Sequence, residues 1–454
     1  MTDVSPSAVS DIRSLPLNDA AILRHREDHR FKTARLSLFV VMPAEKTASP
    51  LTTLLFGVLR RGSERYPRLS LLNRRLDELY GTTLTIRNYL HGDAHVVCYT
   101  AEMPEEDFLP EDRGEGSILD GVMTLLSDMF LHPLTDGDGD LREAAVEQEK
   151  QTLADSLRSL KNDTRAYSAN RLREIMCRGE PYGLSIGGTV EQVSEITPAR
   201  VTAHYRGLLN SLRMEVFYTG RAPAARVAEG WRRAFADWHP GAAPAVDTVC
   251  HIPPVTPREV TETMEVTQGK LCIGWSCGEH YGSLRDHPDT LAAYALCNEV
   301  FGGMQSSLLF RRVREELGLC YFCDSALDMT KGILWVSCGI RADRRAEAEG
   351  AIRRQLTALQ EGRISSDDLE LAKLSLLSVY RQMGDSQSAM EIYDFGRLLN
   401  DTADTPSEEM ERIRRVTADD VMRVARKFKP DTVFFLKGTA EAPAGRGRGE
   451  DDGD

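Results

Sequence analysis

The sequence predicts an α+β fold made of two copies of one structural unit. Three observations lead to this prediction. The chain has 454 residues, which is more than one ordinary domain holds. Short β-like runs alternate along it with longer stretches of helical spacing. The stretch RRLDELYGTTL from Arg74 is echoed by RRVREELGLCY from Arg311, at an offset near half the chain that suggests an internal duplication.

The elements of the first half can be assigned in order. Residues 31–42 (FKTARLSLFVVM) predict a strand, and residues 69–79 predict a helix because leucines recur at helical spacing. Two β-like runs then flank His91-Gly92-Asp93, which predicts a hairpin. Residues 118–130 predict another helix, and a long one is expected from about 141 to 176.

The second half repeats this order after a change in composition. RMEVFYTG predicts the last strand of the first half, and the Pro-rich stretch HPGAAPAVDTVCHIPPVTPRE predicts a linker. MTKGILWVSCGI then stands where LHGDAHVVCYTAEM stands in the first half. The expected organisation is a lead-in at 1–29, a first domain at 30–238, a linker at 239–262, a second domain at 263–438 and a disordered acidic tail at 439–454.

Composition excludes several classes of partner. The net charge of −13 argues against nucleic acid. No apolar run approaches the roughly 18–20 residues that span a membrane. The start of the chain lacks the basic segment and apolar core of a signal peptide. We therefore expect a cytoplasmic protein that binds neither nucleic acid nor membrane.

The nine cysteines lie in apolar stretches, which favours buried thiols over disulfides. CYFC, from Cys320 to Cys323, has CxxC spacing. A zinc site would need a second pair, and the nearest candidates, Cys272 and Cys277, are spaced wrongly for one. We expect structural thiols here, with a metal or redox site as the alternative.

The stretches TLLFGVLRRGSERYP, VEQEKQTLADSL and NEVFGGMQSSLLFRRVREELGLCY resemble the pitrilysin/insulinase family of zinc metallopeptidases, and matching features run from about residue 30 to 438. The resemblance implies two α+β units, each an antiparallel sheet covered by helices. In that family a helix carries HxxEH a few residues before a Gly-Ser or Gly-Thr turn. Aligned on Gly62, the motif positions run from Thr53 to Gly57.

This chain lacks the metal-binding chemistry that the resemblance implies. Two His at i and i+4 share a helix face and bind zinc, and the Glu activates a water. Thr53, Phe56 and Gly57 can do neither. Aligning Glu149 with the first glutamate of the family's later ExxxxxxE pattern places the third ligand position on Ser156. We therefore expect no metal, no cofactor and no catalytic residues.

Two residues of the second half match the family's substrate contacts. Its Arg and Tyr, which bind substrate and stabilise the oxyanion in active members, correspond here to Arg314 and Tyr321. The resemblance implies substrate binding by both residues. The alternative interpretation is a helix-surface arginine and a strand tyrosine packed in the fold.

Three stretches, FKT, LRRGSERYPRLSLLNRRLDELYGTTL and SLKNDTRAYSANRLREIMCRGEPYG, sharpen the resemblance to one bacterial subgroup. This subgroup lacks HxxEH and is associated with 5-aminopentanol modification of elongation factor P. The resemblance implies an inactive peptidase homologue, paired with an HxxEH-bearing zinc peptidase in a hollow heterodimer that takes a peptide or protein substrate. The alternative is a stand-alone scaffold for post-translational modification without proteolysis.

Four further histidines, two in HREDH and two beside the predicted hairpin, are candidates for metal binding. HREDH, from His25 to His29, would place two histidines on one face if it were helical, and an active metalloenzyme using it is the third hypothesis. A polar, solvated lead-in to the first strand is the favoured interpretation. His91 and His95, which flank the predicted hairpin, are expected to be surface histidines.

Overall fold

The computed structural model describes residues 12–110 and 116–439, and these form two compact units. The first unit contains residues 12–160, except 111–115, together with 177–249 and 381–400. The second contains residues 161–176, 250–380 and 401–439. Each unit therefore includes one segment from the opposite half of the chain. Residues 440–454, most of the predicted acidic tail, lie outside the described residues.

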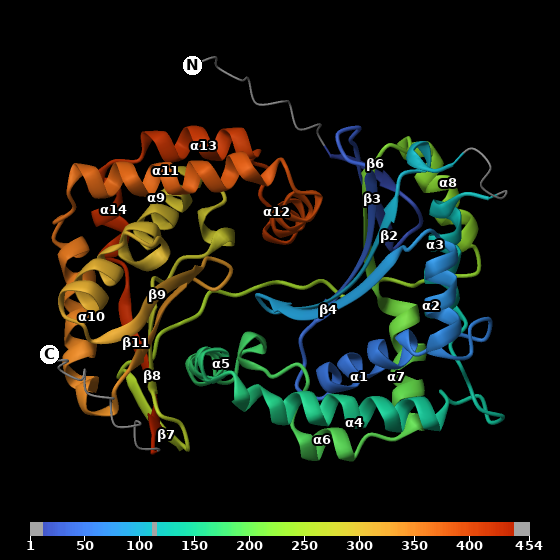
Figure 1. Cartoon of the computed structure of the whole chain (residues 1–454), viewed down its shortest axis with the longest axis horizontal. Helices are drawn as coiled ribbons and strands as arrows, with labels where there is room; N and C mark the ends of the chain where they lie inside the picture. The colour runs from blue at the N-terminus through green and yellow to red at the C-terminus, as the bar shows by residue number, and fades with distance from the viewer. Residues whose placement is uncertain (1–11, 111–115, 440–454) are drawn as a thin grey trace, which may run out of the picture. The chain divides into compact units, whose positions relative to one another are not determined.

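The first unit is built on a six-stranded sheet in the order β1-β2-β6-β3-β5-β4 (Figure 1). Neighbouring strands are antiparallel except β2 and β6, which are parallel. The strands are β1 (Arg13–Pro16), β2 (Ala21–Glu27), β3 (Thr33–Pro43), β4 (Thr83–His91), β5 (Ala94–Pro104) and β6 (Arg213–Gly220). The predicted hairpin is β4–β5, and positive φ at Gly92 makes its tight turn possible.

The second unit is built on a five-stranded sheet in the order β7-β11-β8-β10-β9. Only β7 and β11 are parallel. The strands are β7 (Arg258–Met264), β8 (Gly269–Ser276), β9 (Cys320–Asp328), β10 (Ile333–Ile340) and β11 (Lys429–Gly438). Shifting each strand number by five converts the order β2-β6-β3-β5-β4 of the first sheet into this one, so the duplication suggested by the sequence is present in the topology.

The predicted α+β class is confirmed, and both sheets are mixed rather than wholly antiparallel. In each unit the last strand returns after a series of helices and inserts between the first two strands of the repeat. Such a long connection permits a parallel neighbour, which a hairpin cannot supply. The predicted lead-in and the predicted linker also differ from the structure. The stretch expected as a lead-in contains β1 and β2, and the expected linker ends inside β7.

In the first unit, helices cover both faces of the sheet. The main core lies between one face and helices that include α1, α3 and α8. On the opposite face, Phe395 of α12 packs against Phe39 and Phe217. The helices are α1 (Ala48–Arg60), α2 (Leu69–Glu78), α3 (Ile118–Leu131), α4 (Glu143–Ser159), α6 (Val190–Ser194), α7 (Pro198–Ser211), α8 (Ala224–Ala234) and α12 (Gln387–Asn400). Burial on both faces explains the nearly continuous apolar run of β3.

The second unit has the same arrangement. Its main core lies between one face of the sheet and helices that include α9, α10 and α14. Leu172 and Ile175 of α5 pack against Cys272 and Phe434 on the other face. The helices are α5 (Thr164–Met176), α9 (Pro288–Asn298), α10 (Arg345–Gln360), α11 (Ser366–Met383), α13 (Pro406–Arg415), α14 (Ala418–Ala425) and the π-helical segments η5 (Glu299–Gly303) and η6 (Leu309–Glu316). The two halves of the chain thus exchange α5 and α12.

The single long helix predicted from 141 to 176 is wrong, because the chain breaks between α4 and α5. Asp163 precedes α5, and its Oδ1 accepts hydrogen bonds from the backbone N–H groups of Arg165 at 3.1 Å and Ala166 at 3.0 Å. These bonds cap a new helix rather than continue the old one. The break lets α4 belong to the first unit and α5 to the second.

Asp163→Ala should shorten or fray the start of α5 and lower the free energy of unfolding by about 1 kcal/mol, because two backbone donors lose their acceptor. Urea unfolding and amide hydrogen exchange in α5 measure the effect. Asp163→Asn is the matched control, since Asn caps equally well. Equal exchange in the Ala and Asn variants would show that the cap contributes nothing.

Candidate functional site

The positions implied as zinc ligands lie on α1, the helix packed between the first sheet and α4. At the first position, Thr53 Oγ1 donates a hydrogen bond to the carbonyl of Ile186 at 2.8 Å and accepts one from Asn88 Nδ2 at 2.8 Å. Asn88 Oδ1 in turn bonds His95 Nε2. The hydroxyl that replaces the first histidine is therefore fully engaged in the structure of the protein.

His95 is buried, so the prediction of a surface histidine is wrong. Burial lowers the pKa of its imidazole to about 4, which keeps the ring neutral at pH 7. A second histidine, His204, contacts Thr52 Oγ1 at 2.8 Å, and burial also lowers its pKa. Both rings are held by side chains of the fold and form no group with a third metal-ligating side chain among the described residues.

At the last motif position, Gly57 leaves room for an ion pair. A Cβ atom at this residue would overlap the carboxylate of Glu149, which lies against α1. Arg61 binds that carboxylate through Nε at 2.7 Å and Nη2 at 2.6 Å, and it also donates to Thr152. Burial raises the pKa of Glu149, and the guanidinium of Arg61 opposes this shift. The positive charge next to the Glu149 carboxylate is therefore that of Arg61.

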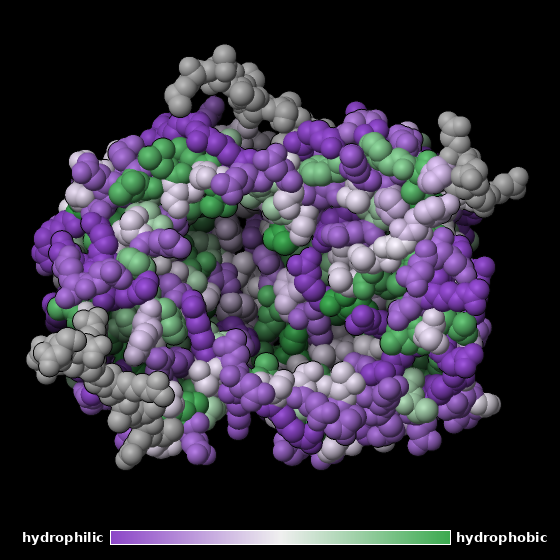
Figure 2. Space-filling model, viewed as in Figure 1, coloured by the Kyte–Doolittle hydropathy of each residue, from purple (hydrophilic) through white to green (hydrophobic). Residues whose placement is uncertain are grey.

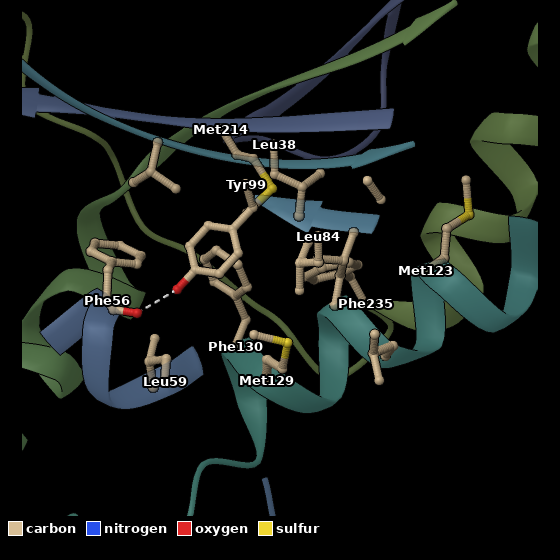
Figure 3. Close-up of a cluster of buried hydrophobic side chains, with 14 of the residues drawn as sticks. Leu38, Phe56, Leu59, Leu84, Tyr99, Met123, Met129, Phe130, Met214 and Phe235 are labelled. Carbon is tan, nitrogen blue, oxygen red and sulfur yellow. Dashed lines mark hydrogen bonds between the residues drawn. The ribbon is translucent and has the colours of Figure 1, made fainter. Parts of the chain in front are cut away.

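The side chain at the glutamate position of the motif points into the core. Phe56 is buried and packs at ring-centroid distances of 5.9 Å against both Tyr99 and Phe130. The hydroxyl of Tyr99 donates a 2.8 Å hydrogen bond to the Phe56 carbonyl, as the dashed line in Figure 3 shows. This position now stabilises the first unit instead of activating water.

The structure corrects the predicted third ligand position. Ser156 is exposed, about two turns of α4 beyond Glu149. It is Glu149 that meets α1 at Gly57. The three positions brought together are therefore Thr53, Gly57 and Glu149. Since Thr53 is hydrogen-bonded, Gly57 has no side chain and Glu149 is paired with Arg61, these residues do not fit a zinc ion.

HREDH is neither helical nor a solvated lead-in, because its first three residues are the end of β2. His25 is buried, contacts the carbonyl of Ala222 at 2.8 Å and stacks on Tyr218. Asp28 binds Arg30, whereas His29 is exposed beside Glu27. The strand separates the two histidines, so the helical metal face that the third hypothesis requires does not form.

Comparison with known proteins finds a family model that matches one segment of the chain. Residues 195–376 match the family model described as the peptidase M16 inactive domain. M16 is the pitrilysin-like family, so this match agrees with the resemblance found in the sequence over that segment.

Longer matches extend the likeness over nearly the whole chain. The probable inactive metalloprotease YmfF of Bacillus subtilis is 28% identical over 413 residues, which are 91% of this chain and 95% of that protein. A conserved protein from Enterococcus faecalis has a TM-score of 0.86 and 24% identity, covering 96% of this chain and 100% of its own. A peptidase M16 inactive domain from Pseudomonas fluorescens has a TM-score of 0.76 and 15% identity, with coverage of 96% and 100%. The last two show the fold alone.

The visible face of the molecule is mostly hydrophilic, with scattered apolar residues (Figure 2). Among the described residues, no helix combines the length and apolar character that crossing a membrane would require.

Both predicted substrate contacts lie in the segment that matches the peptidase M16 inactive domain. Arg314 is in η6, where its guanidinium lies 4.5 Å from the ring centroid of Phe310 and 3.5 Å from Glu315. Tyr321 is the second residue of β9 and is 67% exposed. The interpretation of Tyr321 as a packed strand residue is therefore wrong. A short connection through Gly318 joins the two residues.

The CxxC pair of the same segment has a third cysteine beside it that the sequence analysis did not connect with it. The Sγ atoms of Cys320, Cys323 and Cys338 all lie within 4.8 Å of one another. Cys338 belongs to β10, the strand paired with β9. The sequence signal for this cluster was the hairpin that links β9 and β10, because the turn of a hairpin fixes which residues stand opposite each other.

Proposed function

We propose that this chain is a non-catalytic M16 subunit that pairs with an HxxEH-bearing zinc peptidase of the same family. The partner supplies the metal and the activated water. This chain supplies structure and contacts to a peptide or protein substrate. Inactive M16 domains often pair with catalytic M16 subunits, which is why a partner of this kind is expected.

The observation that carries the proposal is the state of the α1–α4 site. The helices that hold zinc in an active member are retained, but an ion pair between Arg61 and Glu149 and a hydrogen-bonded Thr53 stand in place of the metal. The second unit is folded, and the side chains of Arg314 and Tyr321 are accessible to solvent. Retention of the scaffold without the metal site supports a role in an assembly.

Arg314 and Tyr321 suit substrate contact for chemical reasons. A guanidinium offers several N–H donors to carbonyl oxygens, and a phenol offers one O–H donor to an oxyanion. The side chain of Arg314 is 40% exposed, and its Nε atom lies 3.5 Å from the carboxylate of the adjacent Glu315. Neither residue belongs to the buried core of the second unit. Both can reach a ligand without disturbing the fold.

Arg314→Ala and Tyr321→Phe should each lower kcat/KM of the reconstituted pair by roughly 10²-fold, the usual effect of removing one transition-state donor. The measurement is hydrolysis of a peptide library by the two co-purified chains. Arg312→Ala is the matched control, since Arg312 is an exposed arginine of the same helix that pairs with Glu316. Unchanged activity in both variants would refute the contact role.

A tagged pull-down identifies the partner itself. One-to-one recovery of a chain with intact HxxEH supports the proposal. Recovery of this chain alone, or with a translation factor such as elongation factor P or its modifying enzyme, would instead support the scaffold function and overturn the catalytic pairing.

A further inference from the structure

The three clustered thiols lie on one face of the second sheet because of a β-bulge. Cys320 and Cys323 are three residues apart and would point to opposite faces of a regular strand. The register changes here, since Cys323 stands opposite Cys338 but Cys320 stands opposite Ile340. The three-residue interval from Cys320 to Cys323 in β9 is therefore paired with the two-residue interval from Cys338 to Ile340 in β10. The extra residue restores Cys320 to the face that Cys323 and Cys338 share.

That face is apolar and excludes water. Cys338 is 0% exposed, Cys323 is 5% exposed, and both belong to the main core of the second unit. Cys320 is only partly buried and packs against the edge of that core. The cluster is thus closed toward the protein interior and approachable from the Cys320 side.

The thiols of the cluster are also hydrogen-bonded to one another. The bonds from Cys323 and Cys338 lower the pKa of Cys320. The same bonds raise the pKa of the two donor thiols. Arg314 further favours the negative charge on Cys320. The thiolate is the form of cysteine that binds metals.

We propose that Cys320, Cys323 and Cys338 form a three-thiolate binding site for a monovalent copper ion. Three sulfurs placed about 2.3 Å from one ion lie roughly 4 Å apart, so the present spacing of the three sulfur atoms, within 4.8 Å, needs little adjustment. An all-sulfur donor set selects soft ions such as Cu⁺ or Zn²⁺. Zinc prefers four ligands, and no fourth metal-ligating side chain joins this group among the described residues. Three-coordination in an apolar setting favours Cu⁺.

Metal binding here does not depend on the proposed function, since the three cysteines lie within the second unit and require no partner chain. Binding should release protons from the donor thiols, because each ligand must be deprotonated. It should also raise the melting temperature, as any ligand specific for the folded state does.

The test is an anaerobic titration of the full-length chain with Cu⁺ in competition with a chromogenic Cu⁺ chelator. We expect one Cu⁺ per chain and a sulfur-to-copper absorption band. Cys320→Ser should weaken binding more than about 100-fold, since changing a side chain that merely hydrogen-bonds to a metal ligand already costs roughly 10–100-fold. Cys338→Ser should do the same.

Cys272→Ser is the matched control. Cys272 is also a buried sheet cysteine of this unit, but it packs with α5 on the opposite face. It should bind Cu⁺ like the unaltered chain. Cys320 is partly exposed, so Cys320→Ser decides the question even if Cys338→Ser does not fold. Equal affinity of the unaltered chain and Cys320→Ser, an equal loss in Cys272→Ser, or displacement of Cu⁺ by equimolar Zn²⁺ would each overturn the proposal.

Discussion

Arg35→Met should destabilise the first unit by roughly 3–5 kcal/mol, because it leaves a buried carboxylate without its partner. Arg35 Nε donates to Glu391 Oε1 at 3.0 Å, and the two side chains are only 4% and 1% exposed. Glu391 lies on α12, the helix contributed by the opposite half of the chain. The same helix face carries Asp394, whose Oδ2 binds Arg26 at 2.7 Å. The variant should therefore loosen α12 from the sheet.

The loss should depend on pH in a definite direction. Burial raises the pKa of Glu391 above its ordinary 4.5, and Arg35 opposes that shift. Removing Arg35 raises this pKa further. A carboxyl whose pKa is higher in the folded than in the unfolded state binds its proton more tightly when the protein is folded. The free energy of unfolding therefore falls as the pH rises above 4.5. Arg35→Met should thus recover part of its lost stability when the pH is lowered from 7 toward 5.

Urea unfolding at both pH values, with amide hydrogen exchange in α12, measures this effect. Arg74→Met is the matched control, since Arg74 pairs with Glu78 on an exposed helix surface. Such pairs contribute roughly 0.5 kcal/mol or less. Arg35→Met/Glu391→Gln should regain much of the stability by removing the stranded charge. If Arg35→Met unfolds like Arg74→Met, the buried pair does not hold α12.

Restoring the zinc motif should fail, and its central substitution should be the most damaging. Phe56→Glu places a carboxylate among the rings of Tyr99 and Phe130. Removing a buried phenylalanine alone costs roughly 3–5 kcal/mol, and burying an unpaired polar group adds to this. Gly57→His would in addition force Glu149 away from Arg61. The combined variant Thr53→His/Phe56→Glu/Gly57→His should be largely unfolded and free of bound zinc.

The measurement is the free energy of unfolding together with zinc content after dialysis. Phe56→Leu is the control, because it keeps an apolar side chain and should cost much less than Phe56→Glu. A folded triple variant that retains one zinc per chain would show that this fold can hold an HxxEH zinc site. It would also contradict the assignment of Phe56 to the core.

The α1 site shows how far family-level reasoning from sequence carries. The missing ligands at Thr53 and Gly57 followed from the resemblance to the peptidase family, since that resemblance marks the two positions and neither residue can bind zinc. The third ligand position could not be assigned in the same way, because Ser156 and Glu149 share one helix and only packing decides which of them contacts α1. Arg61 was visible as a helix-terminal arginine, but nothing local indicated its partner, 88 residues away.

Sequence patterns predicted the α+β class and the duplication, because periodicity and repeated order are local properties. The loss of the zinc motif followed from the resemblance to the peptidase family. Only the folded structure revealed the exchange of α5 and α12, the Arg61–Glu149 pair and the contact of Cys338 with the CxxC pair. Each of these depends on long-range packing or strand register. The bulge in β9 makes the point most directly, since one extra residue reverses which face a side chain occupies.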